Sequence, residues 1–244
     1  MSEQVYFTNC RGQKLAGLID GELSDRAVIC CHGMLSTKNG TKHQYLAELI
    51  AGMGIAVLRF DFAGRGDSEG RLFDLTYSNE MEDLYAAVEF LAGRGVERLG
   101  LFGSSMGGAI ALMGAAREER FVAIATLAAV AHTNEVEVRH PVEAESWKTH
   151  GYADTEAGRI GKAFYEDALE HNVLGAVRVL RAPILVLHGD LDEVVPPLDA
   201  HDIAVAARNV SLEIVQGADH RFSNPVHLRP AMRAIAAFLV GHLR

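Results

Sequence analysis

The sequence predicts an α/β fold in which helices cover both faces of a mostly parallel sheet. From residue 27 onward, short apolar segments with the pattern of strands alternate with segments of helical spacing. This alternation is typical of parallel strands joined by crossover helices. The segment 27–31 is apolar throughout, as expected for a strand that is buried on both faces. Polar loops follow several of these strands, at the edge where such folds gather their sites.

The individual elements follow from the same patterns. Residues 5–7 and 14–19 have the composition of strands and are separated by turn-forming residues at 9–12, which predicts a hairpin. Further strands are expected at 27–31, 55–60, 98–102, 122–127, 184–188 and 211–215. Helices are expected at 41–53, 79–91, 107–117, 197–207 and 231–242.

Residues 132–180 interrupt the alternation. They show no clear strand between two strands of the sheet, and they contain the single tryptophan of the chain, Trp147. An insertion of this size at the top of a sheet predicts a helical cap rather than a second domain. We therefore expect residues 1–244 to form one domain in which 132–180 is a cap with a solvated outer face.

Composition excludes several classes of function. The chain has 244 residues, a formal charge of −9 and no basic run, which argues against binding to nucleic acid or to an anionic membrane surface. No apolar run is long enough to span a bilayer, and no signal segment is visible at the N-terminus. Three cysteines provide no disulfide framework, so we expect a cytoplasmic protein. The oligomeric state is not indicated.

A glycine-flanked serine provides a candidate nucleophile. Gly103-x-Ser105-x-Gly107 lies between the strand expected at 98–102 and the helix expected at 107–117. A turn this tight would hold Ser105 in a strained conformation with its hydroxyl exposed above the strand ends. The free N–H groups at the start of the helix would point to the same place. Ser104 lies one residue before the apex and is expected to point elsewhere.

A serine nucleophile needs a base, usually a histidine that a carboxylate orients. The loop after the strand at 184–188 contains Asp190 and Asp192, and the loop after the last strand contains Asp219 and His220. The chain order is therefore Ser, Asp, His, with each residue at the carboxyl end of a parallel strand. Both Asp190 and Asp192 are candidates for the orienting acid.

Four segments resemble those of a known superfamily. They are His32-Gly33, the D-x-x-G-x-G-x-S loop at 61–68, the serine turn, and the H-G-x-x-D-x-x-V-P segment at 188–196. In this order they resemble the α/β-hydrolase superfamily, and within it the serine esterases and lipases related to cinnamoyl/feruloyl esterases and monoacylglycerol lipases. Together with His220 the match covers residues 30–220, although no motif in the cap contributes to it.

The resemblance assigns roles to individual residues. It implies an α/β-hydrolase fold of about eight strands in which Ser105 is the nucleophile, His220 the base and Asp192, rather than Asp190, the acid. The backbone N–H groups of Met34 and Met106 would then form the oxyanion hole.

The candidate substrate-binding residues come from two regions, the third strand end and the cap: His32, Gly33, Trp147, Tyr152 and Phe164. The cap aromatics, together with Tyr165, either line an acyl pocket or form the core of the cap itself. His32 and His188 precede glycines at strand ends, where a structural role in holding loops is expected.

No cofactor or metal is expected. Cys30, Cys31 and His32 are consecutive on a strand and so point to alternate faces, which is unsuited to metal binding. The glycine-rich loop at 61–70 does not fit the dinucleotide fingerprint, and no phosphate-binding G-K-[ST] motif occurs. A serine at position 105 also argues against hydrolases that use a carboxylate nucleophile.

The sequence thus predicts a serine hydrolase that cleaves small acyl or aryl carboxylic esters through an acyl-enzyme. The same three residues also serve thioesterases, amidases or aminopeptidases, and carbon–carbon bond hydrolases, so these remain alternatives. A small-molecule binding protein that retains the fold without turnover is a further alternative of a different class.

Overall fold

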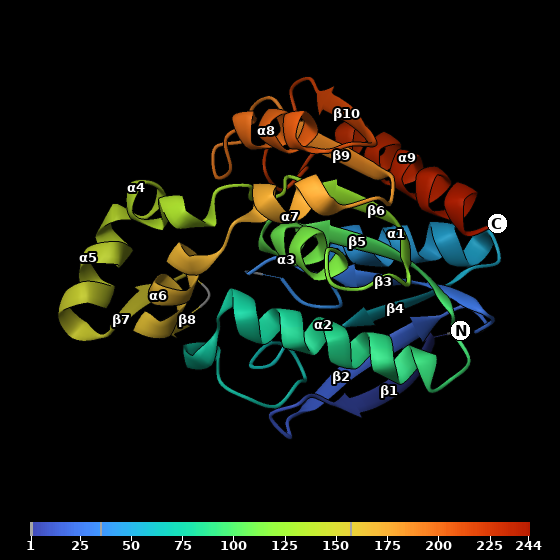
Figure 1. Ribbon diagram of the computed structural model, residues 1–244, viewed down its shortest axis with the longest axis horizontal. Helices are drawn as coiled ribbons and strands as arrows, with labels where there is room; N and C mark the ends of the chain where they lie inside the picture. The colour runs from blue at the N-terminus through green and yellow to red at the C-terminus, as the bar shows by residue number, and fades with distance from the viewer. Residues whose placement is uncertain (1, 35, 157) are drawn as a thin grey trace.

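The computed structural model describes residues 2–34, 36–156 and 158–244. Within these residues, one sheet contains eight strands in the order β1-β2-β4-β3-β5-β6-β9-β10 (Figure 1). The predicted α/β-hydrolase fold is confirmed by this mostly parallel sheet and its helices. The strands are β1 (Ser2–Thr8), β2 (Lys14–Asp20), β3 (Arg26–Cys31), β4 (Ala56–Phe60), β5 (Arg98–Ser104), β6 (Phe121–Leu127), β9 (Ile184–Gly189) and β10 (Val210–Val215).

The antiparallel part of the sheet is confined to its N-terminal edge. Strands β1 and β2 form the expected hairpin, and β2 also pairs antiparallel with β4. The hairpin turn is closed by Asn9, whose side-chain oxygen accepts hydrogen bonds from the N–H groups of Arg11 and Gln13 at 3.0 and 2.9 Å. All other neighbouring strands in the sheet are parallel, so their carboxyl ends meet at one edge.

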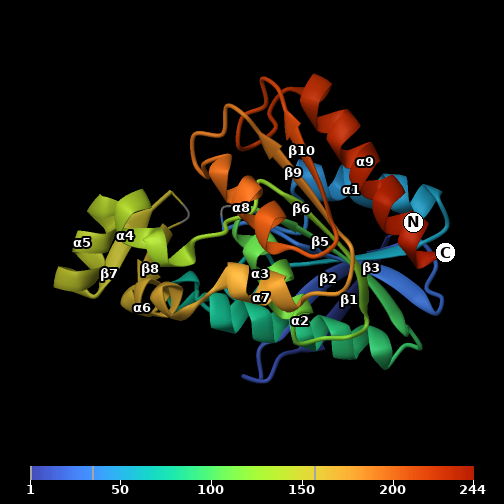
Figure 2. The same cartoon turned by 45° about the horizontal axis from the view of Figure 1, so that its top comes forward.

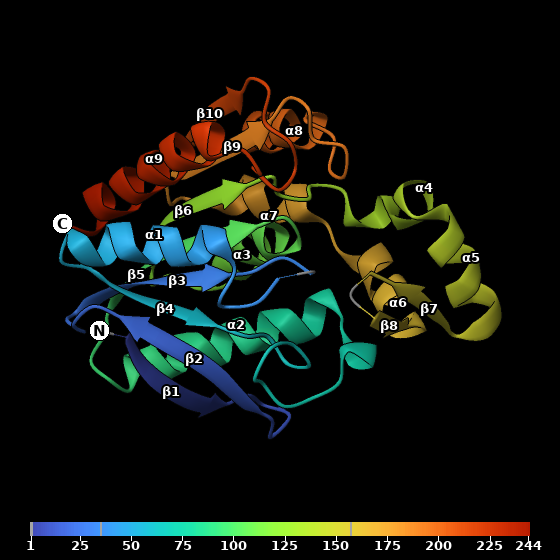
Figure 3. The same cartoon turned by 180° about the vertical axis from the view of Figure 1, so that it is seen from behind.

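Two helical layers cover the sheet. Helices α1 (Thr41–Gly52) and α9 (Pro225–Leu243) lie together on one face, which Figure 3 shows toward the viewer. The other face carries α2 (Tyr77–Ala92), α3 (Met106–Ala115), α7 (Val173–Val179) and α8 (Leu198–Ala206) (Figure 1). All ten residues of α3 are buried. The apolar core accordingly has two parts, one on each side of the sheet.

Helix α9 begins six residues earlier than the pattern indicated, at Pro225 instead of 231. The side chain of Asn224 caps it by accepting a hydrogen bond from the N–H of Val226 at 3.0 Å. A proline is tolerated in the first turn because its missing N–H would have no partner there. Pro230 lies inside the helix, directly before the start that was expected at 231. No helix in the part of the chain that the structure describes is long and apolar enough to cross a membrane.

The insertion after β6 forms a separate lobe, which we call the cap, residues 133–170. Figures 1 and 2 show it beside the helical layer of α2, α3 and α7, away from the sheet. It consists of η2 (Thr133–Glu135), α4 (Val136–Arg139), α5 (Pro141–His150), β7 (Tyr152–Thr155), β8 (Gly158–Gly161) and α6 (Lys162–Glu170).

The insertion differs in two details from the all-helical segment expected at 132–180. Strands β7 and β8 form an antiparallel hairpin, and each is only four residues long, too short for the alternation that marks a strand. Helix α7 packs against α3 and α8, so it belongs to the layer that covers the sheet. A short turn, η1 (Leu72–Asp74), contacts β8 from the body of the protein.

Candidate active site

Ser105 occupies a strained turn between β5 and α3. Its φ and ψ angles are 57° and −124°, a region that residues with a side chain rarely adopt. A Cβ atom on Gly103 would lie 2.2 Å from the carbonyl oxygen of Gly107, and one on Gly107 would lie 2.4 Å from that of Cys31. The two glycines are therefore required by close backbone packing, which holds the serine at the sheet edge.

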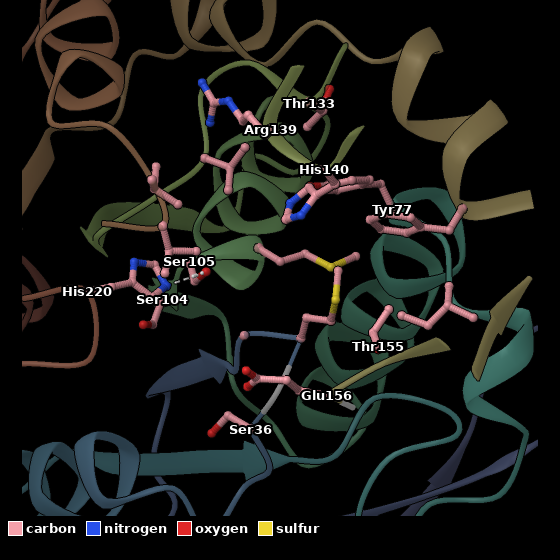
Figure 4. A pocket seen from close by; sticks show the side chains of 18 of the residues that line it. Ser36, Tyr77, Ser104, Ser105, Thr133, Arg139, His140, Thr155, Glu156 and His220 are labelled. Atoms are coloured by element: carbon pink, nitrogen blue, oxygen red, sulfur yellow. Dashed lines mark hydrogen bonds between the residues drawn. The ribbon is translucent and has the colours of Figure 1, made fainter. Parts of the chain in front are cut away.

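Ser105 and His220 are hydrogen bonded across the carboxyl edge of the sheet (Figure 4). The distance from Ser105 Oγ to His220 Nε2 is 3.0 Å, and His220 Nδ1 lies 2.8 Å from Asp192 Oδ2. Because Nδ1 faces a carboxylate, it carries the ring proton, and Nε2 is free to accept the serine proton. The structure thus brings together the three residues that the sequence placed in separate loops.

Asp192 is held by several donors. Its Oδ1 accepts hydrogen bonds from the N–H groups of Val194 and Val195 at 2.9 and 2.8 Å. Burial disfavours the charged carboxylate, but hydrogen bonds from His188 and His220 outweigh burial and lower the pKa of Asp192 well below its usual value. Asp192 is therefore an ionised carboxylate in a fixed orientation.

Asp190, the competing carboxylate, has a different partner. Its Oδ1 accepts a hydrogen bond from the N–H of Gly217 at 2.6 Å, which ties the loop after β9 to the turn after β10. Asp219 likewise accepts from the N–H of Ser223 at 2.7 Å. The geometry thus leaves Asp192 as the carboxylate against His220 Nδ1.

His188 is a contact of Asp192 that the sequence did not reveal. It is fully buried, and its Nε2 lies 3.0 Å from Asp192 Oδ2 and 2.9 Å from the carbonyl oxygen of Val195. A proton on Nε2 can be shared between these two acceptors. The sequence indicated only that His188 holds the loop. The spacing of four residues between His188 and Asp192 was the one sequence feature that could have indicated their contact.

The loop after β3 passes directly beside Ser105. A Cβ atom on Gly33 would lie 3.2 Å from Ser105 Cβ and 3.8 Å from its Oγ. Met34 follows in this loop, and Met106 opens α3, where the helix leaves its N–H unpaired. Within the described ranges, neither N–H has a hydrogen-bond partner, and both residues line the same cavity as Ser105. Two backbone donors are therefore available near the serine oxygen.

His32, a candidate substrate contact from the sequence, is not among the residues that line the cavity. It is buried, with Nδ1 donating to the carbonyl oxygen of Gly33 at 2.9 Å and Nε2 accepting from the N–H of Phe62 at 3.2 Å. Burial lowers the pKa of His32 to about 4, so the ring is neutral. His32 thus fixes the loop, whereas its neighbour Gly33 lines the cavity.

A cavity of about 840 Å³ opens above Ser105, between the body and the cap (Figure 4). Trp147 and Phe164 line it and also pack on each other, with ring centroids 5.4 Å apart. These two side chains therefore line the cavity and also form part of the core of the cap. Tyr152 is not part of the lining and packs against Arg159, and Tyr165 stacks on Trp147 outside it.

Several lining residues have no motif that could have identified them. Tyr77 opens α2 and stacks on Phe164 of the cap at 5.7 Å, which closes the cavity between the two parts of the molecule. His140, Arg139 and Lys42 also line the cavity. Each reaches it through long-range packing, which leaves no local pattern in the sequence.

The described residues contain no group of three or more histidine, cysteine, aspartate or glutamate side chains suited to a metal ion. Cys30 and Cys31 are buried in β3, and burial raises the pKa of the Cys30 thiol to about 12. Both are packed in the core as unreactive thiols.

Residues 42–244 match the family model described as the prolyl oligopeptidase family. The chain belongs to the prolyl oligopeptidase family. One relative is the mitochondrial palmitoyl-protein thioesterase ABHD10 of Pongo abelii, 30% identical over 215 residues that cover 83% of this chain and 69% of that protein.

Solved structures have the same fold. The complex of ferulic acid with Est1E from Butyrivibrio proteoclasticus matches with a TM-score of 0.88 and 23% identity over 98% of each chain. The esterase domain of a Rhodothermus marinus protein matches with a TM-score of 0.80 and 28% identity over 100% of each chain. This member of the prolyl oligopeptidase family is thus a hydrolase.

Proposed function

We propose that the protein hydrolyses carboxylic esters of small molecules through an acyl-enzyme on Ser105. The observation that carries the proposal is the continuous chain of hydrogen bonds from Ser105 through His220 to Asp192, at 3.0 and 2.8 Å. A base within hydrogen-bond reach of a strained serine that lines a cavity supports nucleophilic catalysis.

In the first half of the reaction, Ser105 Oγ attacks the ester carbonyl carbon while His220 Nε2 takes the serine proton. The carbonyl oxygen becomes negative and accepts hydrogen bonds from the N–H groups of Met34 and Met106. Loss of one donor of this kind typically costs about 10²–10³ in rate. The C–O bond of the ester then breaks as His220 gives its proton to the leaving alcohol.

In the second half, His220 takes a proton from water, and the resulting hydroxide attacks the acyl carbon on Ser105. The tetrahedral intermediate uses the same two N–H donors. Its collapse returns the proton from His220 to Ser105 Oγ and releases the carboxylic acid. Asp192 stabilises the protonated His220 in both halves, and no cofactor is required.

The acyl or aryl group is assigned to the part of the cavity that faces the cap. Trp147, Phe164 and Tyr77 give this part an aromatic lining, which suits an apolar group of moderate size. Thioesters are the second candidate substrates, because a relative that is 30% identical carries the name palmitoyl-protein thioesterase. The same serine and base serve both bonds.

A substrate panel on two serine variants tests the proposal. We expect the wild type to react with a fluorophosphonate and to turn over p-nitrophenyl esters, and Ser105→Ala to lose the label and at least about 10³-fold in rate. Ser104→Ala is the matched control, because it removes the hydroxyl of the neighbouring serine. This variant should keep both the fluorophosphonate labelling and the ester turnover. Near-normal turnover by Ser105→Ala would exclude the proposed nucleophile.

The panel also identifies the bond. Oxygen esters, thioesters and anilides that share one acyl group should be compared by kcat/KM. We expect oxygen esters to be cleaved best; a clear preference for thioesters or anilides would replace the ester proposal with one of those activities. Acyl groups of increasing length, together with an aryl acyl group, then define the cap-facing part of the cavity.

A further inference from the structure

Lys42 lines the cavity of Ser105 and, within the described residues, has no carboxylate or aromatic ring as a partner. It lies in the first turn of α1 and lines the same cavity as Ser105 and His220. The chain has five lysines, and the other four each contact a carboxylate or an aromatic ring: Lys14 with Tyr6, Lys38 with Asp61 and Asp67, Lys148 with Glu137, and Lys162 with Glu166. Lys42 has no such partner among the residues that the structure describes.

The charged groups that face Lys42 do not neutralise it. They are Asp192, Asp219 and Arg221, all on the loops that carry the acid and the base. Asp192 already accepts hydrogen bonds from backbone N–H groups and histidines, and Asp219 accepts from the N–H of Ser223. Burial lowers the pKa of Lys42 to about 8, so the side chain still carries its charge at neutral pH.

A partly buried ammonium without a partner is unfavourable unless a ligand supplies the missing acceptor. A second positive group, Arg65, lines the same cavity, and its Nε is buried without a partner within the described ranges. The cavity thus contains two cations with unused hydrogen-bond donors, although the chain as a whole has a formal charge of −9. The cavity is also lined by the carboxylates Glu143 and Glu156, but Glu156 is paired with Arg221, so the donors of Lys42 and Arg65 remain available to an anionic group.

The position of Lys42 assigns this anion to one part of the substrate. The leaving group takes its proton from His220 and must therefore lie beside the loop that carries this histidine. Lys42 faces that loop through Asp219 and Arg221. The aromatic lining formed by Trp147 and Phe164 belongs to the cap. The cavity thus combines an aromatic cap side with a cationic side near the base.

We propose that Lys42 binds an anionic group, a carboxylate or a phosphate, on the leaving group of the substrate. The preferred substrates would then be esters or thioesters whose alcohol or thiol part is negatively charged and whose acyl part is apolar. The inference rests on the proposed hydrolysis at Ser105, and it deepens that proposal by naming the charge of the leaving group.

Matched esters test the inference. The butyrate esters of 3-hydroxybenzoate and 3-hydroxybenzamide have the same shape and acyl group, but only the first carries a negative charge. The butyrate ester of 3-hydroxyphenyl phosphate distinguishes a phosphate from a carboxylate. The quantity to measure is the ratio of kcat/KM for an anionic ester to that for the neutral one, since general damage to the enzyme cancels in it.

We expect Lys42→Met to lower this ratio about tenfold, the effect of losing one hydrogen bond to a charged group. Lys42→Arg should keep most of the ratio because it restores the charge. The control Lys162→Met removes a lysine that is paired with Glu166 on the cap and should keep the wild-type ratio.

Other results would overturn the proposal that Lys42 binds an anionic leaving group. An unchanged ratio in Lys42→Met, or an equal loss for all three esters, would overturn the inference while leaving the proposed hydrolysis intact. Turnover of the neutral ester by the wild type tests the proposed hydrolysis separately. If the wild type cleaves none of the three, both proposals fail. The larger of the two anionic ratios identifies the anion.

Discussion

The body around Ser105 and the cap above it are built in different ways. In the body, the site groups are fixed by tight backbone packing at Gly103 and Gly107 and by several hydrogen bonds to Asp192. In the cap, the walls of the cavity come from short helices and a short hairpin that hold few backbone contacts with the sheet. The proposed catalytic residues and the cap-side walls of the cavity therefore depend on separate parts of the chain.

Polar contacts join the cap to the body. Arg139 of α4 forms hydrogen bonds of 2.7 and 2.9 Å with the buried carboxylate of Asp199 in α8. On the other side, Asp167 of α6 accepts hydrogen bonds from the hydroxyl and the N–H of Ser78 in α2 at 2.5 and 3.1 Å. These contacts hold the cap over Ser105 without involving Ser105, His220 or Asp192, so under the proposed function we expect changes in the cap to alter selectivity while the chemistry is retained.

The largest expected effect lies in the body. Asp192→Asn should lower kcat/KM for a p-nitrophenyl ester by about 10⁴, as the equivalent change does in serine proteases, because an amide stabilises the wrong tautomer of the histidine. Asp190→Asn removes a carboxylate from the same loop and should lose far less, since Asp190 contacts the N–H of Gly217 rather than His220. If Asp190→Asn is the more damaging change, the acid has been assigned to the wrong carboxylate.

A smaller effect is expected from the cap wall. Phe164 and Tyr165 are both buried in α6, but only Phe164 lines the cavity. Phe164→Leu should change the ratio of kcat/KM between a bulky aryl ester and a short acyl ester by about tenfold, in the range of one altered apolar contact. Tyr165→Leu should destabilise the cap but keep this ratio. Equal changes in the two variants would show that the wall acts only through the stability of the cap.

The smallest expected effect concerns stability. Glu80 in α2 is buried with both carboxyl oxygens unpartnered within the described ranges, whereas carboxylates of the cap such as Glu137 and Asp154 form ion pairs. Burial, together with the nearby charge of Asp83, raises the pKa of Glu80 well above its usual value of 4.5. Above pH 4.5 the unfolded chain therefore ionises while the folded protein keeps the proton, so this group lowers stability as the pH rises.

Glu80→Gln removes this ionisation. Its melting temperature should exceed that of the wild type by a few degrees at pH 7, which corresponds to about 1–3 kcal/mol, and by less at pH 4.5. The control Glu82→Gln, exposed on the same helix, should show little change at either pH. A difference for Glu80→Gln that is the same at both pH values would contradict a buried, protonated carboxyl.

The sequence by itself determined the features that depend on local patterns. Short apolar runs predicted the strands of the sheet, and apolar residues at helical spacing predicted most helices that cover it. The glycines around Ser105 predicted a strained turn, because only small residues fit into that turn. The chain order of serine, acid and histidine, combined with parallel strands, placed all three at one edge of the sheet. The start of α9 was missed because a proline inside a helical pattern usually interrupts the helix, and Pro230 lies directly before the expected start.

Only the tertiary structure decided the features that depend on residues distant in the chain. It showed that Asp192 rather than Asp190 faces His220. The two carboxylates are two residues apart in one loop, and the structure distinguishes them by their hydrogen-bond partners, which are His220 for Asp192 and the N–H of Gly217 for Asp190. It also showed that Lys42 has no carboxylate or aromatic partner in the described part of the chain, and that Tyr77 stacks on Phe164 of the cap. Such contacts leave no periodic signal in the sequence, because they arise where separate elements pack together in space.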